Sequence, residues 1–306
     1  MIKHIPLEGL IAAPHTPFHE DRSLNLKMIE AQAQSLVANR VTGAFVCGTT
    51  GEGLSLTIAE RIQVAERWRT VAPKNLRVIV HVGHVGLDDC RALATNAQQI
   101  GADAIACLAP CFFKPGSVED LVQFCAEVAT AAPELPFYYY QIPSMTGVNF
   151  NVADFLIAAS GRIPNLVGIK FTHENLMDFL QCLHLENGRF DMVFGRDEVM
   201  LGGLATGARA AIGSTYNFAA PIYHRLMAAF AKGDLVTARK EQLRSVELIQ
   251  LLASYGFMGA AKATMKMIGV DVGPARLPNR TLTKEQASKL QAELERLGYF
   301  EWLKAG

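Results

Sequence analysis

The sequence predicts a (β/α)8 TIM barrel, a closed ring of eight parallel strands alternating with helices, followed by a C-terminal helical extension. Eight short apolar runs recur at intervals of roughly 25 to 35 residues, and amphipathic stretches separate them. After Lys232 and Gly233 the chain continues with helical patterns only. No glycine-rich dinucleotide-binding motif follows the first run, which disfavours an open, doubly wound sheet.

Most of the predicted strands are continuously apolar, which is typical of strands buried on both faces of a parallel sheet. Their expected ranges are 10–13, 43–47, 78–82, 104–108, 137–141, 167–171, 192–195 and 210–213. The active site of such a barrel lies where the strands end, so polar residues directly after each run are candidates. In the fifth run, side chains alternate, so Tyr138 and Tyr140 should face one side and Tyr139 the other.

The helices are predicted from apolar residues spaced three and four apart. Their expected ranges are 25–39, 57–71, 88–100, 117–131, 152–160, 175–185, 199–206, 221–231, 235–254, 258–268 and 284–296. Thr57 and Glu60 have the spacing of a capping box, and Ser117 is the expected cap of the fourth helix. We expect residues 1–233 to form the barrel and 234–306 an extension packed on it, as one structural domain.

The composition excludes several classes of protein. Of 306 residues, 50% are hydrophobic, and 29 Lys and Arg balance 29 Asp and Glu. A nucleic-acid-binding protein would need a basic face and a membrane protein an apolar run of about 18 residues, so neither partner is expected. The N-terminal residues lack the apolar core of a signal peptide, and six cysteines without a CxxC pair fit reduced thiols. We therefore expect a cytoplasmic enzyme with a small-molecule substrate.

Lys170 stands inside a strand that is otherwise apolar. A charged amine in such a position is desolvated, so it tends to lose its proton. A neutral amine is the nucleophile that forms a Schiff base with a carbonyl substrate. The alternatives are a lysine that extends to solvent at the strand end and one that pairs with a carboxylate.

Two further segments at strand ends carry hydroxyl groups. Tyr140 would direct its phenol into the barrel mouth and move a proton beside an imine, unless it serves only aromatic packing. The loop GTTGEG at 48–53 combines flexible glycines with Thr49 and Thr50, which suits a carboxylate or a phosphate, although a simple tight turn fits equally well. The loop is not a P-loop, because the GK[ST] ending is missing.

The seventh and eighth runs are followed by GRDE at 195–198 and GSTYN at 213–217. Neighbouring carboxylates there would accept hydrogen bonds from a polyol, or Asp197 would instead cap the short helix that follows. His81 and His84 lie three residues apart, but no third ligand stands at zinc spacing, so no metal is expected.

Four motifs, each at the end of a predicted strand, together resemble one known family. They are GTTGEG at 48–53, YYYQIP at 138–143, GIKFT at 168–172 and GSTYN at 213–217. Over essentially its whole length the chain resembles the N-acetylneuraminate lyase and dihydrodipicolinate synthase family of class I pyruvate aldolases. The resemblance implies a (β/α)8 barrel with a helical extension, a homotetramer, and catalysis through a Schiff base without a cofactor.

The resemblance also implies roles for individual residues. Lys170 matches the lysine that forms the imine with pyruvate, and Tyr140 matches the tyrosine that relays a proton. Thr49 and Thr50 match the hydroxyl pair that orients the pyruvate carboxylate and supports the tyrosine. Binding of a sialic acid is assigned to the remaining positions, which are Thr172, Gly195, Asp197, Glu198, Gly213 and Ser214.

Two departures favour the sialic acid lyases over the synthases. Where the synthases hold an aldehyde carboxylate with an arginine, this chain has Met145, and where they supply a tyrosine across a dimer it has Phe112. Gln141 is a further departure, to which no role is assigned. We expect reversible cleavage of N-acetylneuraminate to N-acetylmannosamine and pyruvate. The alternatives are another pyruvate aldolase or dehydratase acting on 2-keto-3-deoxy sugar acids, a dihydrodipicolinate synthase, and a catalytically silent keto-acid-binding barrel.

Overall fold

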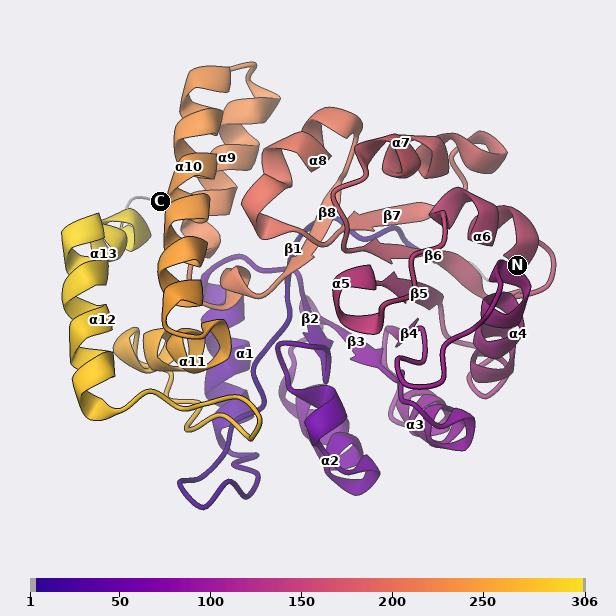
Figure 1. Cartoon of the computed structure of the whole chain (residues 1–306), viewed down its shortest axis with the longest axis horizontal. Coiled ribbons are helices and arrows are strands. Elements are labelled where there is room, and N and C mark those ends of the chain that lie inside the picture. Colours follow the sequence, from indigo (N-terminus) through magenta and orange to yellow (C-terminus); the bar gives the residue numbers. More distant parts are fainter. Residues whose placement is uncertain (1–3, 305–306) are drawn as a thin grey trace.

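The computed structural model describes residues 4–304, and its centre is a closed barrel of eight parallel strands (Figure 1). The strands pair in chain order, and the last pairs with the first, with Ala211 opposite Leu10. The predicted fold class is therefore confirmed. The strands are β1 (Gly9–Ala12), β2 (Gly43–Val46), β3 (Arg77–His81), β4 (Ala104–Leu108), β5 (Phe137–Gln141), β6 (Leu166–Phe171), β7 (Asp191–Phe194) and β8 (Ala210–Gly213).

The helices between the strands lie close to their predicted ranges. They are α1 (Met28–Ala38), α2 (Ile58–Val71), α3 (Leu87–Gln99), α4 (Val118–Ala129), α6 (Val152–Ala159), α7 (Leu176–His184) and α8 (Met200–Thr206), with α9 (Ala220–Ala231) after the last strand. The first begins later than expected, at Met28, because the residues before it form a tighter turn, in which the N–H of Met28 bonds to the carbonyl of Asn25 at 3.1 Å.

Several helices of one or two turns are not predicted from the sequence, because so few residues leave no room for apolar spacing to repeat. They are α5 (Pro143–Thr146), α13 (Tyr299–Lys304) and the 3₁₀ helices η1 (Gly53–Ser55), η2 (Leu185–Asn187), η3 (Asp197–Val199) and η4 (Thr215–Asn217). Three of the 3₁₀ helices follow β2, β7 and β8, so they shape the loops at the carboxyl ends of those strands.

The predicted helix caps are present. At the start of α2, the Thr57 hydroxyl accepts a bond from the Glu60 N–H, and the Glu60 carboxylate accepts one from the Thr57 N–H at 2.9 Å. At the start of α4, the Ser117 hydroxyl accepts a bond from the Asp120 N–H at 3.1 Å. These bonds satisfy N–H groups that have no partner within the helix itself.

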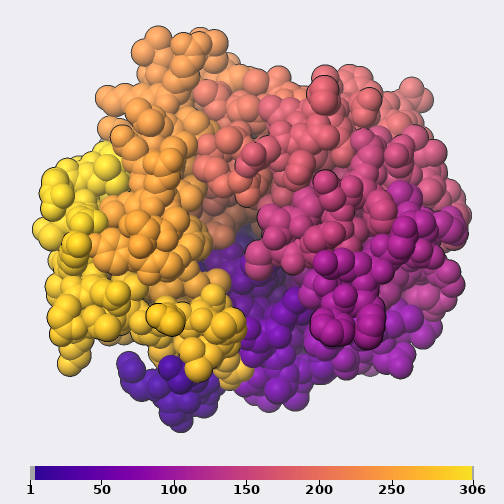
Figure 2. Space-filling view, viewed as in Figure 1, coloured from indigo at the N-terminus to yellow at the C-terminus, as the bar shows by residue number. Residues whose placement is uncertain are grey.

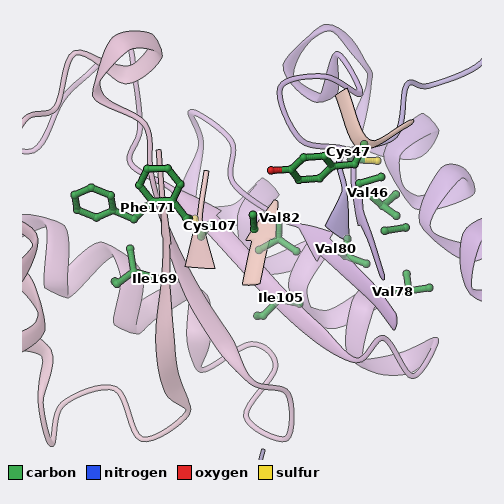
Figure 3. Packing of buried hydrophobic residues seen from close by; sticks show 14 of the residues in the cluster. Val46, Cys47, Val78, Val80, Val82, Ile105, Cys107, Ile169 and Phe171 are labelled. Atoms are coloured by element: carbon green, nitrogen blue, oxygen red, sulfur yellow. The ribbon is translucent and has the colours of Figure 1, made fainter. Parts of the chain in front are cut away.

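Alternate residues of the strands form two apolar layers, one inside the barrel and one between the strands and the helices. On β5, Tyr138 and Tyr140 belong to the inner layer, while the ring of Tyr139 packs on Phe155 of α6 with 4.6 Å between ring centroids. The predicted alternation of the three tyrosines is confirmed. Figure 3 shows part of the outer layer, to which Val80 belongs.

The C-terminal helices lie together on one side of the barrel (Figure 1). They are α10 (Leu235–Ser254), α11 (Phe257–Met267), α12 (Lys284–Leu297) and α13. Helix α10 contacts α8, α9 and η3, and α13 contacts α9. Figure 2 shows a hollow between these helices, in orange and yellow, and the pink and magenta part of the barrel. Within residues 4–304, no helix has both the length and the apolar character needed to cross a membrane.

Thr57→Ala should destabilise the fold by about 1 kcal/mol, because it removes one acceptor of the capping box of α2. We expect scanning calorimetry to show a melting temperature lowered by about 2 °C. Thr70→Ala is the matched control, since Thr70 lies near the other end of α2 and its hydroxyl bonds to the Glu66 carbonyl. Equal losses in the two variants would contradict a particular role for the cap.

Candidate active site

The carboxyl ends of β2, β5, β6, β7 and β8 border a cavity of about 220 Å³, which we call the lysine cavity. This is the end of the barrel at which active sites of this fold lie. The structure brings all the predicted site residues together around it, although they come from five separate stretches of the chain. They are Thr49, Thr50, Tyr140, Lys170, Thr172, Gly195, Asp197, Glu198, Gly213 and Ser214.

Lys170 is buried on β6, so a lysine directed to solvent is the wrong interpretation. Its Nζ lies 3.8 Å from the ring centroid of Phe45 and 3.9 Å from that of Tyr140. Desolvation lowers the pKa of the amine to about 7, while the Asp197 carboxylate acts in the opposite direction. A large share of the amine is therefore neutral and nucleophilic near neutral pH.

Tyr140 is held beside this amine by aromatic packing and one hydrogen bond. Its ring meets Phe45 and His81 edge-on, at centroid distances of 5.3 and 5.6 Å. Its hydroxyl oxygen lies 3.1 Å from Thr49 Oγ1. Burial raises the pKa of Tyr140 to about 12, and the bond with Thr49 lowers it only in part, so the phenol carries its proton at neutral pH.

The loop of residues 48–53, which we call the threonine loop, adopts a conformation that few residues allow. Glu52 has a left-handed φ of +53°, and a Cβ on Gly53 would lie 1.9 Å from the carbonyl oxygen of Cys47. Thr50 Oγ1 lies 2.6 Å from Ser214 Oγ, which joins the loops after β2 and β8. This bond places two hydroxyl groups together at the wall of the lysine cavity.

Asp197 lies in η3 and is oriented by Thr215. Its Oδ2 accepts bonds from the N–H and the hydroxyl of Thr215 at 3.0 and 2.7 Å. The hypothesis that Asp197 caps the following helix is wrong, because that helix begins at Met200 and its cap residue, Val199, makes no side-chain bond. Burial raises the pKa of Asp197, and the bonds from Thr215 lower it in opposition.

Two glycines leave space for buried oxygen atoms of residues that line the lysine cavity. A Cβ on Gly213 would lie 1.8 Å from Asp197 Oδ1, and one on Gly195 would lie 2.2 Å from Thr172 Oγ1. Among residues 4–304, neither of these two oxygens has a hydrogen-bond partner, although both are buried. Buried oxygens without a partner are costly unless a ligand or a water molecule satisfies them.

Some residues of the cavity wall were not identified from the sequence. Ile249 of α10 and Phe257 of α11 reach it from the C-terminal helices. Thr215 belongs to the GSTYN motif, so its hydroxyl could have been proposed. Arg196 also lines the cavity, and its guanidinium bonds to Glu198 at 3.0 Å and to Glu174.

A second cavity, of about 270 Å³, lies beside the lysine cavity and shares Thr49 with it. Met145 lines this second cavity, and Phe112 is exposed on the surface. His81 also borders it, with Nδ1 3.0 Å from the Cys47 carbonyl oxygen. Within residues 4–304, no group of three or more His, Cys, Asp and Glu side chains is placed to hold a metal ion.

The chain is similar to known proteins over nearly its whole length. The profile of the dihydrodipicolinate synthetase family matches residues 6–297. The N-acetylneuraminate lyase of Rattus norvegicus is 41% identical over 98% of this chain and 96% of its own length, and that of Gallus gallus is 43% identical over 94% and 96%. The solved N-acetylneuraminate lyase of Proteus mirabilis has a TM-score of 0.93 and 43% identity, covering 96% of this chain and 99% of that one.

Asp197→Asn should lower the pKa of the Lys170 amine below about 7, because the carboxylate is the charge that opposes desolvation. The amine reacts when neutral, so the variant should be acylated at lower pH than the parent. Peptide mass spectrometry after labelling with a small acylating reagent gives the midpoint. Lys266, whose pKa is raised by Asp271, is the exposed internal reference. An unchanged midpoint for Lys170 would count against this account.

Proposed function

The chain belongs to the dihydrodipicolinate synthetase family, and we propose on this basis that it is a class I aldolase that cleaves N-acetylneuraminate reversibly to N-acetylmannosamine and pyruvate. One observation carries the proposal. The Lys170 amine, whose pKa lies at about 7, is buried against the ring of Tyr140 in a cavity whose other walls bear carboxylates and hydroxyls. A neutral amine beside a phenol is the arrangement that imine-forming aldol chemistry requires.

In the proposed reaction, Lys170 Nζ attacks C2 of the open-chain keto acid, and loss of water gives an imine. Tyr140, supported by Thr49, gives its phenolic proton to the substrate carboxylate and takes up the proton of the C4 hydroxyl as the C3–C4 bond breaks, so the phenol ends the step protonated. The protonated imine takes up the electron pair of that bond and becomes an enamine. N-acetylmannosamine leaves, the enamine is protonated at C3, and water releases pyruvate from Lys170. No cofactor beyond this covalent imine is proposed.

The substrate is held at two ends in this proposal. Thr50, with Thr49 and the amides of the threonine loop, binds the carboxylate of the pyruvate part. The sugar end is bound by polar groups on the loops after β6, β7 and β8. Gly195 and Gly213 leave the space that these groups need, and the remaining contacts come from Thr172, Asp197, Glu198 and Ser214.

Other pyruvate aldolases and dehydratases that act on 2-keto-3-deoxy sugar acids would use the same lysine and tyrosine, and a panel of such acids separates them from this proposal. A dihydrodipicolinate synthase is disfavoured, because Met145 offers a thioether where an arginine would bind a carboxylate. A catalytically silent barrel that binds a keto acid would not form an imine that borohydride reduces.

We further propose a cytoplasmic homotetramer in which residues 1–233 and 234–306 form one structural domain. The six free cysteines fit a reducing compartment. The exposed large apolar side chains include four on the loop after β4 and on the adjacent helices α6 and α7, where assembly would cover them. They are Phe112, Phe113, Ile157 and Met177. Light scattering of the purified chain tests the assembly.

Lys170→Ala should reduce pyruvate release from N-acetylneuraminate by about three orders of magnitude or more, because the imine cannot form. A coupled assay of NADH oxidation by lactate dehydrogenase measures the release, and borohydride reduction with pyruvate should add mass to the parent only. Lys232→Ala, at an exposed lysine after α9, is the control. Full turnover by Lys170→Ala would refute the mechanism, whereas a silent parent that still traps pyruvate would point to another keto acid.

Tyr140→Phe should lower kcat about 100-fold with little change in KM, because it removes a proton carrier and leaves the ring in place. Imine trapping with pyruvate should persist in this variant. Tyr139→Phe is the matched control, since Tyr139 is the adjacent residue of β5 and lies in the outer apolar layer. A similar loss of kcat in both variants, or a loss confined to KM, would exclude the proton-transfer role.

A further inference from the structure

A buried ion pair lies directly behind the threonine loop. Glu52 Oε1 is 2.9 Å from Lys262 Nζ, and the two side chains are 0% and 2% exposed. Glu52 belongs to the threonine loop, whereas Lys262 is on α11 of the C-terminal extension. Neither residue lines the lysine cavity, so neither would contact the substrate there.

Lys262 connects three parts of the chain through its ammonium group. Its Nζ donates to the carbonyl oxygens of Thr16, after β1, and of Pro274, after α11, at 2.9 and 2.8 Å. The hydroxyl of Thr16 in turn donates to the carbonyl of Gly51 at 2.6 Å. The threonine loop is therefore tied to Lys262 twice, once through the Glu52 carboxylate and once through Thr16.

The other carboxylate oxygen of Glu52 accepts two hydrogen bonds. Oε2 accepts bonds from the backbone N–H of Arg276 at 2.8 Å and from the side-chain amide of Asn279 at 3.2 Å. Both donors lie in the segment between α11 and α12. Glu52 is a non-glycine residue in the left-handed region, a conformation that persists only where surrounding contacts hold it. Here the contacts of its carboxylate supply that hold.

The charges of this pair depend on each other. Burial lowers the pKa of Lys262, while the Glu52 carboxylate raises it in opposition. Removing one partner leaves the other charge buried without compensation, so the segment that bears it is expected to move toward water. For Glu52 that segment is the threonine loop itself.

We propose that the Glu52–Lys262 ion pair is a positioning device, by which the C-terminal extension sets the location of the Thr49 and Thr50 hydroxyls at the active site. This inference rests on the proposed aldolase function of those hydroxyls. Glu52 is three residues from Thr49, whose hydroxyl contacts Tyr140 at 3.1 Å. A displacement of about 1 Å at a reacting group lowers turnover by as much as 100-fold.

Glu52→Gln is the test variant, because it removes the charge, keeps the size of the side chain and keeps one acceptor oxygen for the Arg276 N–H. The rate of N-acetylneuraminate cleavage is measured and divided by the amount of chain that borohydride traps with pyruvate. This ratio is the kcat per site that can form the imine, which we call kcat per competent site. We expect this quantity to fall about tenfold or more. A crystal structure of the variant should show Thr49 Oγ1 displaced from Tyr140. Lys262→Met should give a similar loss, and the double variant should lose no more than the single variants, since the two residues act as one pair.

Lys266→Met is the matched control, because Lys266 lies one turn further along α11 and pairs with Asp271 at the surface. It should leave kcat per competent site unchanged.

If Lys262→Met fails to fold, Asn279→Ala removes one bond to Glu52 and should give a smaller loss. A lower melting temperature with unchanged kcat per competent site, and an unmoved Thr49, would overturn the proposal. A parent that neither traps pyruvate nor cleaves the sugar would instead overturn the proposed function, while the position of Thr49 still tests the pair.

Discussion

The desolvation of one amine is the constraint on which the site depends. Lys170 lies on β6, and alternate residues of the strands fill the interior of the barrel. The apolar packing of this inner layer also desolvates the Lys170 amine and lowers its pKa to about 7. Asp197 opposes this shift from the next strand end, and its carboxylate is held in place by Thr215 and by the absence of a side chain at Gly213. Fold stability and nucleophilicity therefore have a common physical origin.

The parts of the site that could be predicted from the sequence follow from the barrel itself. Parallel strands end at one face, so residues placed directly after each run must meet there, however far apart they are in the chain. Lys170 was identifiable because a cation within an apolar run is unusual, and Tyr140 because alternation along β5 separates it from Tyr139. A correct prediction of the fold therefore also predicts that the candidate residues lie together.

The parts that escaped prediction depend on contacts between elements that local patterns do not encode. The helices that bear Ile249 and Phe257 were expected close to their observed ranges, but apolar spacing does not reveal which helical face meets the barrel mouth. The pairing of Glu52 with Lys262 joins a loop after β2 to the C-terminal extension, and neither residue is unusual within its own segment. Such long-range pairs become visible only when the chain is folded.

Charge at the sugar end of the lysine cavity argues for a neutral, hydroxyl-bearing substrate tail. Glu174 and Glu198 share the single guanidinium of Arg196, and Asp197 adds a further carboxyl group whose Oδ1 is left to accept a bond. A tail that ends in a carboxylate would meet like charge there, whereas hydroxyl groups would donate to these oxygens. Met145 leads to the same conclusion from the neighbouring cavity, because it supplies no cation for a carboxylate. The two arguments are independent, since Met145 and Glu198 belong to different loops and line different cavities.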